Sequence, residues 1–371
     1  KKENIKIGYL PKLTNRQTML IDGNEYQTIN QIRRKSGIYS RLRQNGELEA
    51  EFNLSKGHNF KMQLDPEDQV FYISFENRKY RLWTLLNVLG ISDAEISKIW
   101  GTKLLEINKT GALNTETSEL TALYKRFYKK DETDFRVILD GINKYFKTGT
   151  AVDPETTKLT LGKAFTAVDG TALLATSEKL LKISKGEAKL DDRDSLIFKH
   201  IYSADDLLYS YFESQKPALK SKLERTLGLK EEIRDIVTPG TFTDPIKKFF
   251  TTGDLSSTPV QTNPLMIASE IMKTTVMGTG GIKNQHSVTD ETRNVEPTQL
   301  GFLDPNASPE SLKIGLSVGL ASEVQKVGKE MKTPIYDSKT KTMVLFSPLE
   351  FYNNKVGFPD QKDLKGNALV K

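Results

Sequence analysis

Residues 8–39 of this 371-residue chain read GYLPKLTNRQTMLIDGNEYQTINQIRRKSGIY. In the middle of the stretch, a strand-like run over residues 18–21 enters Asp22-Gly23 and is followed by a second run over residues 24–26. An Asp-Gly pair in this position is typical of a β-hairpin with a two-residue turn, because both residues tolerate positive φ angles. The stretch therefore predicts antiparallel β structure in this part of the chain.

Strand periodicity changes to helical periodicity between residues 70 and 96. Apolar side chains alternate over residues 70–75, which predicts a half-buried strand. Leucines then recur at helical spacing over residues 82–89 and stop at Gly90, which predicts a helix that ends at a glycine. Ser92 and Glu95 have the spacing of a capping box, so a second helix is expected to begin there.

The rest of the chain contains further helices and one long irregular region. Periodicity predicts helices over residues 118–147, over residues 170–184 and from about Ala204 onward. Ser203 is the expected cap of the last of these, Pro217 is expected to open a new segment, and Asp244-Pro245 is expected to start a helix over residues 246–250. Residues 251–311 are rich in Thr, Gly, Pro and Asn, which predicts loops and short elements that serve a function.

Composition excludes several kinds of site. The chain has no cysteine and only His58, His200 and His286, which are far apart, so disulfides, thiolate zinc sites and serine–histidine catalysis are not expected. No run approaches the ~18 apolar residues that a membrane-spanning helix needs. The net charge of +6 permits a polyanionic partner without requiring one. Composition therefore predicts no catalytic residue and no metal ligand of the cysteine or histidine type in this chain.

Residues 274–284, TTVMGTGGIKN, are rich in glycine and could form a phosphate-binding loop. A Walker loop needs lysine directly after its last glycine and a hydroxyl residue after the lysine. Here Ile282 separates Gly281 from Lys283, and Asn284 follows. The glycine spacing also departs from the dinucleotide-binding pattern. A glycine-rich turn is the favoured interpretation, and a nucleotide-binding enzyme remains an alternative.

Two charged motifs have functional and structural interpretations. Asp191-Asp192-Arg193-Asp194 has the carboxylates for a magnesium site, but its internal arginine favours a solvated or capping acidic turn. The basic runs Arg33-Arg34-Lys35, Lys125-Arg126 and Lys129-Lys130 are most often solvated faces, with phosphate contact as the alternative.

Four blocks of sequence together resemble one protein family. The first is residues 8–39, where nine positions carry the likeness: Pro11, Thr14, Thr18, Ile21, Gly23, Glu25, Gln31, Arg34 and Gly37. The second covers residues 60–90, and the third covers residues 185–194 with DDRD. The fourth comprises FF at 249–250, LS at 255–256, QTNPL at 261–265, MGTGG at 277–281, RNVEPT at 293–298 and IGL at 314–316. In this order the blocks resemble the N-terminal half of the β subunit of multisubunit DNA-directed RNA polymerase, and most of all the split β subunits of giant (jumbo) bacteriophage polymerases.

The resemblance implies an α+β, multidomain, mixed α/β polymerase β-subunit architecture with protrusion, lobe and fork. Residues 1–40 are then the protrusion-like N-terminal part, and residues 41–188 are a lobe-like domain. Residues 189–320 are a protrusion and fork region with a segment like fork loop 2, and residues 321–371 begin the following β region.

The resemblance also implies nucleic-acid contacts. In the segment like fork loop 2, the residues expected at the downstream edge of the transcription bubble are Gly278, Gly280, Gly281, Ile282 and Lys283. Those that fall on a pocket for a downstream non-template base are Asp194, Lys199, Ile282 and Thr292, with lysine in place of arginine and threonine in place of valine. Those that fall along the RNA path are Ser257, Lys273, Asn284, Glu310 and Lys313, and Asn284 and Lys313 depart from the residues usual there.

The implied function is that of one wall of the DNA and RNA channel in DNA-templated RNA synthesis. The implied partners are the chain with the β C-terminal half, β′-like chains, both DNA strands, nascent RNA and a specificity factor, with no membrane. No cofactor is expected in this chain, and catalytic Mg²⁺ would be held by the β′-like partner. The implied location is the host bacterial cytoplasm or the virion for a phage-encoded chain, and otherwise the cytoplasm. A standalone nucleic-acid-binding module is a further alternative.

Overall fold

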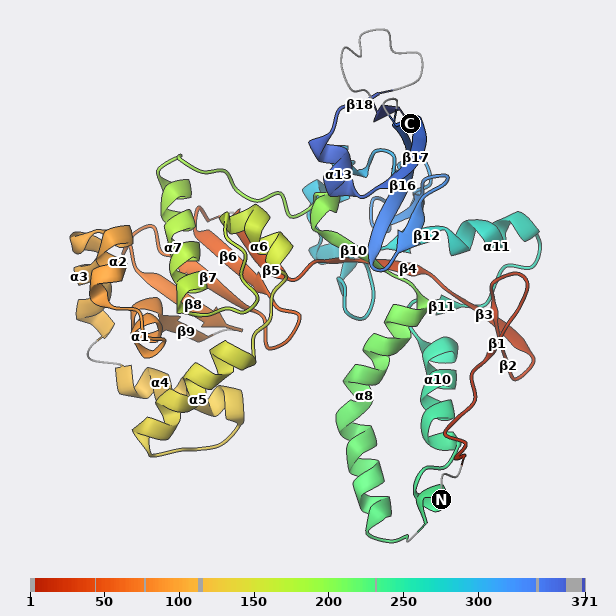
Figure 1. Ribbon diagram of the computed structural model, residues 1–371, viewed down its shortest axis with the longest axis horizontal. Coiled ribbons are helices and arrows are strands. Elements are labelled where there is room, and N and C mark those ends of the chain that lie inside the picture. The colour runs from red at the N-terminus through yellow and green to blue at the C-terminus, as the bar shows by residue number, and fades with distance from the viewer. Residues whose placement is uncertain are drawn as a thin grey trace. The chain divides into compact units, whose positions relative to one another are not determined.

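The computed structural model describes residues 4–43, 45–76, 78–112, 116–230, 232–337, 340–357 and 369–370. The chain forms two compact units, one of residues 34–193 and one that combines residues 1–33 with residues 194–371 (Figure 1). The mixture of helices and several separate sheets confirms the prediction of an α+β, multidomain chain. The predicted domain bounds after residues 40, 188 and 320 and the subdomain names remain predictions.

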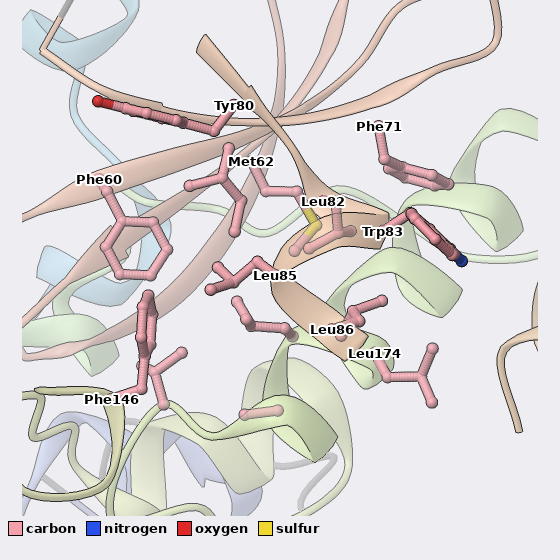
Figure 2. Close-up of a cluster of buried hydrophobic side chains, with 14 of the residues drawn as sticks. Phe60, Met62, Phe71, Tyr80, Leu82, Trp83, Leu85, Leu86, Phe146 and Leu174 are labelled. Atoms are coloured by element: carbon pink, nitrogen blue, oxygen red, sulfur yellow. The ribbon is translucent and has the colours of Figure 1, made fainter. Parts of the chain in front are cut away.

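The unit of residues 34–193 is an antiparallel sheet packed against helices. Its strands follow one another in the order β5 (Gly37–Leu42), β6 (Leu48–Asn53), β7 (Phe60–Leu64), β8 (Phe71–Phe75) and β9 (Arg78–Arg81). Its helices are α1 (Leu82–Val88), α2 (Asp93–Trp100), α3 (Thr102–Ala112), α4 (Glu116–Tyr128), α5 (Phe135–Thr148), α6 (Pro154–Leu161) and α7 (Gly170–Ser184). Strand side chains such as Phe60 and Met62 meet the leucines of α1 and Phe146 of α5 in one interior (Figure 2).

Local sequence patterns in this unit are mostly confirmed. Ser92 and Glu95 form the predicted capping box, and the helix over residues 82–88 ends before Gly90, whose φ is 85°. The prediction of one helix over residues 118–147 is wrong, because α4 ends at Tyr128 and Lys129 adopts a φ of 53°. The carboxylate of Asp134 then accepts the backbone N–H of residue 136 and caps a separate helix, α5.

One carboxylate joins the two ends of this unit. Glu51 lies on β6 and pairs with Arg34 at 2.8 Å and with Arg193 at 3.1 Å. Arg34 is the first residue of the unit and Arg193 is the last. Burial acts to raise the pKa of this carboxyl, but the guanidinium groups of Arg34, Arg193 and Arg41 outweigh it, so the pKa lies below its usual value.

The other unit contains three smaller sheets. The first has the order β1 (Lys12–Leu13), β2 (Met19–Ile21), β3 (Asn24–Thr28) and β11 (Ser256–Ser257). The second has the order β10 (Lys199–Tyr202), β4 (Asn30–Arg34), β12 (Lys273–Thr275), β14 (Ser317–Leu320) and β13 (Leu303–Asp304). The third consists of β15 (Gln325–Val327), β16 (Glu330–Asp337), β17 (Thr342–Phe346), β18 (Val356–Gly357) and β19 (Leu369–Val370).

Helices and short helical turns connect these sheets. The α-helices are α8 (Ala204–Leu227), α9 (Ile233–Ile236), α10 (Gly240–Thr252), α11 (Pro264–Ile271), α12 (Asp290–Arg293) and α13 (Pro348–Asn353). The 3₁₀ turns are η1 (Leu196–Phe198), η2 (Gln285–Ser287) and η3 (Pro297–Gln299). Residues 251–311 are built of short elements, as predicted. In the described part of the chain, no helix is long and apolar enough to cross a membrane.

The predicted hairpin is present at the start of this unit. Met19 pairs with Tyr26 and Ile21 pairs with Asn24, which leaves Asp22 and Gly23 as the turn. Their φ angles are 48° and 86°. Two positive φ values are those of a type I′ turn, whose twist matches that of the flanking strands.

Both predictions of a helix start at a proline are wrong. α8 continues through Pro217, and α10 begins at Gly240 and contains Pro245. Each proline removes one backbone hydrogen bond within its helix. α8 and α10 lie side by side (Figure 1), with the Tyr211 and Phe249 rings 5.7 Å apart, and this aromatic packing keeps both helices continuous across the missing bonds.

Candidate nucleic-acid interface

The glycine-rich segment forms a tight turn closed by its own backbone. The N–H of Gly278 donates to the carbonyl of Ile282 at 3.1 Å, and the N–H of Gly281 donates to the carbonyl of Gly278 at 2.9 Å. The N–H of Ile282 donates to the carbonyl of Val276 at 2.9 Å. These three amides are satisfied within the turn, so they are not open to a phosphate as the amides of a phosphate-binding loop are.

Side chains from distant parts of the chain brace this turn. Gln31 donates from Nε2 to the carbonyl of Met277 at 2.6 Å, and Arg33 donates from Nη2 to the carbonyl of Thr279 at 3.0 Å. The hydroxyl of Thr279 donates to a carboxylate oxygen of Asp254 at 2.6 Å. The turn is therefore held in one conformation, and the interpretation of Arg33 as part of a solvated basic face is wrong.

Gly281 is required by close packing against backbone, whereas Gly280 faces the end of the Arg33 side chain and has a left-handed backbone conformation. A Cβ atom on Gly281 would lie 2.4 Å from the carbonyl oxygen of Val276, and one on Gly280 would lie 2.5 Å from Cζ of Arg33. Gly280 also has a φ of 86°. Lys283, just past the turn, is exposed, and its side chain has no partner in the part of the chain that the structure describes. A braced backbone thus presents a cation to the solvent.

The structure brings together three of the four residues predicted for the base pocket. Asp194 lies 3.6 Å from Nζ of Lys199 and accepts a hydrogen bond from the hydroxyl of Thr292 at 3.2 Å. All three line a small cavity of about 40 Å³, whose wall does not include Ile282. A cavity of this size has room for about three water molecules.

The residues predicted along the RNA path lie on several elements. Ser257 is exposed at the end of β11, and Lys273 on β12 pairs with Glu270 at 3.0 Å. Glu310 and Lys313 are exposed. In the described part of the chain, no hydrogen bond or ion pair joins these four predicted side chains to one another.

Asn284, the fifth residue predicted along the RNA path, lies at a helix end. Its side-chain oxygen accepts the N–H of His286 at 3.0 Å and so caps the 3₁₀ turn η2. This local contact orients the segment that follows Lys283. The nucleic-acid role of Asn284 and of the other four residues along the path stays a prediction.

The sequence that forms this site is similar to sequences of known proteins. Residues 259–325 match the family model described as RNA polymerase Rpb2, domain 3. The chain is 26% identical over 370 residues to the DNA-directed RNA polymerase subunit beta of Prochlorococcus marinus strain AS9601, an alignment that covers 91% of this chain and 33% of the relative. It is 27% identical over 363 residues to the same subunit of Trichormus variabilis, covering 88% of this chain and 31% of the relative.

This chain is similar to the β subunit of DNA-directed RNA polymerase. It spans about a third of the length of the curated relatives that it matches. The matched Rpb2 domain contains the braced glycine turn, together with several of the residues predicted to contact RNA.

Within the segment that matches Rpb2 domain 3, Arg293 is a positioning residue to which the sequence analysis gave no role. Its Nη1 donates to the carbonyls of Leu312 and Ile314, both at 2.9 Å, and its Nη2 donates to the carbonyl of Gln285 at 2.9 Å. One guanidinium thus links the segment next to Asn284 to the segment around Lys313. The block RNVEPT marked this arginine as a family residue, but no local pattern identifies its carbonyl partners.

The same block also positions the segment that carries Asp194. The hydroxyl of Thr298 accepts the N–H of Leu196 at 2.7 Å, and the carboxylate of Glu296 accepts the N–H of Thr298 at 2.8 Å. The Thr298 hydroxyl also donates to Glu296. In this way the β-subunit-like block holds Asp194 and Thr292 on neighbouring segments, although they are 98 residues apart in the chain.

Asp191, the first residue of the acidic motif 191–194, has a structural role. Asp191 accepts the backbone N–H of Ser40 at 2.8 Å and its hydroxyl at 2.7 Å, and pairs with Lys179 at 2.5 Å. Among the described residues, no three histidine, aspartate or glutamate side chains converge as a metal site would require. The magnesium interpretation of this motif is therefore not supported.

Proposed function

We propose that this chain is the N-terminal part of the β subunit of a multisubunit DNA-directed RNA polymerase, and that it forms one wall of the DNA and RNA channel. The observation that carries the proposal is the Rpb2 domain 3 match over residues 259–325, which contains the glycine turn. In this proposal the turn is the fork at the downstream edge of the bubble, corresponding to fork loop 2.

The contact with nucleic acid would be positional and independent of base sequence. A braced turn with a free lysine beside it supports this role, because lysines bind phosphates electrostatically and a fixed backbone sets the distance of approach. Lys283 would contact a phosphate, and Ile282 would lie against a base at the bubble edge. The pocket of Asp194, Lys199 and Thr292 would meet the non-template strand through bound water or after opening.

The chemistry would come from partner chains. In two-metal phosphoryl transfer, paired ions activate the attacking oxygen and stabilise the leaving oxygen. A β′-like chain would hold this Mg²⁺, and a chain with the β C-terminal half would complete the grip on RNA. The chain alone would be inactive. A split β subunit encoded by a giant bacteriophage is the specific form that we propose, acting in the bacterial cytoplasm or in the virion with a specificity factor.

Co-purification tests the assembly. The chain, expressed with an affinity tag in its natural setting, should recover a second chain that carries the motif D-F-D-G-D, and the recovered complex should synthesise RNA on a DNA template. Recovery of the chain alone, with nucleic-acid binding intact, would instead identify a standalone binding module. ATP hydrolysis by the purified chain that is lost on Gly280 or Lys283 substitution would identify a nucleotide-binding enzyme.

The role of the turn has its own test in the assembled enzyme. Alanines at Gly278, Gly280 and Gly281 should slow elongation or disturb the bubble, whereas Lys283→Gln should weaken retention on DNA mainly at low salt. The matched control is Lys222→Gln, an exposed lysine on α8 away from the turn. Normal elongation by the glycine variants would mean that the turn has only a structural role.

A further inference from the structure

A cavity of about 480 Å³ lies behind the glycine turn, within the unit of residues 1–33 and 194–371. α8 and α10 supply one side of it, including Tyr211 and Phe249. Thr279 and Gly280 of the turn supply part of the wall, and so does Arg33. Its volume is within the range of pockets that hold small organic molecules.

The charge on the cavity wall is not balanced. Arg33 forms no ion pair among the described residues, and the nearby Asp206 is already paired with Lys326 at 2.5 Å. Burial is the largest influence on the Arg33 guanidinium and lowers its pKa. Lys248 adds a second positive charge, against the single carboxylate of Asp254. The cavity therefore favours an anion.

The opposite parts of the wall are aromatic and hydroxylic. The rings of Tyr211 and Phe249 are 5.7 Å apart, so they form a continuous apolar surface. Thr28 also lines the cavity, and its hydroxyl is buried without a hydrogen-bond partner in the described part of the chain. A buried polar group of this kind is costly unless a ligand or an ordered water molecule satisfies it.

We propose that this cavity binds a small organic anion with an aromatic body. The negative group pairs with Arg33, and the ring packs on Tyr211 and Phe249. Because Arg33 also donates to the carbonyl of Thr279, the bound ligand contacts the brace of the glycine turn as well as the turn itself. The inference rests on the cavity and stands apart from the polymerase assignment.

Calorimetric titration of the full chain tests the charge requirement. The probe is 1-naphthalenesulfonate, and its matched neutral analogue is 1-naphthalenemethanol. The sulfonate should bind at least tenfold more tightly, since a charge-assisted hydrogen bond to a half-buried guanidinium has about that value. Arg33→Gln should remove the difference. Equal affinity of the two probes for the unmodified chain would overturn the proposal.

A cavity-filling variant separates binding from the bracing role of Arg33. Ser214 lines the cavity from α8, so Ser214→Phe should abolish sulfonate binding and leave the circular dichroism spectrum unchanged. Ser221→Phe on the same helix lies outside the cavity and should bind as the unmodified chain does. Retained binding in Ser214→Phe contradicts the assignment to this cavity.

The last test is competition between a single-stranded oligothymidylate and the bound 1-naphthalenesulfonate. The oligothymidylate should leave the bound sulfonate in place. Displacement of the sulfonate with the same dependence on Arg33 would overturn the proposal of a small-molecule site and assign the cavity to the path of a nucleic-acid strand.

Discussion

The two units of this chain are stabilised in different ways. In the described part of the chain, the unit of residues 34–193 has one continuous core of 30 buried apolar residues. The other unit has two separate cores of 7 and 3 such residues, and it contains every residue predicted to contact nucleic acid. In the candidate site, hydrogen bonds from side chains to backbone carbonyls hold the backbone in place. In the other unit, apolar packing has this role.

The two units differ in how they are stabilised because the candidate site has to expose its backbone turn to solvent. An exposed turn is not covered by an apolar core, so its shape has to be fixed by polar bonds from the residues beneath it. Gln31 and Arg33 act in this way by donating to carbonyls 246 residues away, and Arg293 does so by donating to carbonyls 8–21 residues away. Removing such a donor breaks hydrogen bonds to exposed or partly buried carbonyls, whereas removing a core side chain leaves a cavity.

The largest expected effect is in the single core. Phe146→Ala removes a fully buried ring next to Phe60 and Phe127, and should lower the free energy of unfolding by about 3–5 kcal/mol. Trp83 and Trp100, the chain's two tryptophans, both lie in this unit, so urea unfolding followed by tryptophan fluorescence reports on it alone. Phe135→Ala on the same helix is the control and should cost less than about 1 kcal/mol. Equal losses in the two variants would contradict a single cooperative core.

The next effect concerns polar bracing. Arg293→Lys keeps the charge but cannot reach three carbonyls, two of which are solvent-exposed, so it should destabilise the local structure by about 1–2 kcal/mol. Hydrogen exchange measured by mass spectrometry should speed up at residues 285–287 and 312–316, with residues 34–193 unchanged. Lys248→Arg is a control for a charge-conserving change at an exposed site. Unchanged exchange in both segments would show that the bonds of Arg293 are not needed.

Comparing Gly23 with Gly280 separates the cost of a steric clash from the cost of backbone strain. Gly23 and Gly280 both have a φ of 86°, but only at Gly280 would a Cβ meet another group within 4 Å, the Arg33 guanidinium. Gly23→Ala should cost about 1 kcal/mol through strain alone, and Gly280→Ala should cost about 1 kcal/mol more. Hydrogen exchange around each turn measures the two opening free energies. Equal losses would mean that Arg33 moves aside freely.

The smallest effect depends on pH. Because the pKa of Glu51 is lower in the folded chain than in the unfolded one, its stabilisation is complete above the unfolded value of about 4.3 and is lost as the pH falls through the folded value. At pH 7, Glu51→Gln should lower the stability of residues 34–193 by on the order of 1 kcal/mol. The urea midpoints of the two proteins, followed by tryptophan fluorescence, should converge toward pH 3. A constant gap would exclude ionisation as the cause.

The elements that the sequence predicted correctly are those with local causes. The Asp22-Gly23 turn and the Ser92 capping box are set by residues within a few positions of each other. The errors at Pro217 and Pro245 have a distant cause, because packing between α8 and α10 outweighs one missing backbone bond in each helix. The single predicted helix over residues 118–147 failed because the positive φ of Lys129 has no sequence pattern that marks it.

The candidate site shows the same division. The order of motifs along the chain pointed to the glycine turn, and the structure brings together Asp194, Lys199 and Thr292 but not Ile282, while their role stays a prediction. The braces could not be predicted, because Arg33 and Thr279 are 246 residues apart and neither belongs to a pattern that names the other. From its charge, the basic run around Arg33 was predicted to be a solvated face. In the structure, Arg33 instead donates a hydrogen bond that braces the glycine turn.

The Glu51 carboxylate, which pairs with both ends of the unit of residues 34–193, has a consequence for how that unit can be exchanged. Glu51 brings Arg34 and Arg193 to one point, so the chain enters and leaves this unit at neighbouring positions. A unit with adjacent ends can be gained, lost or exchanged by recombination without stretching the chain that hosts it. Residues 34–193 therefore have the organisation of a unit that can be exchanged without stretching the rest of the chain.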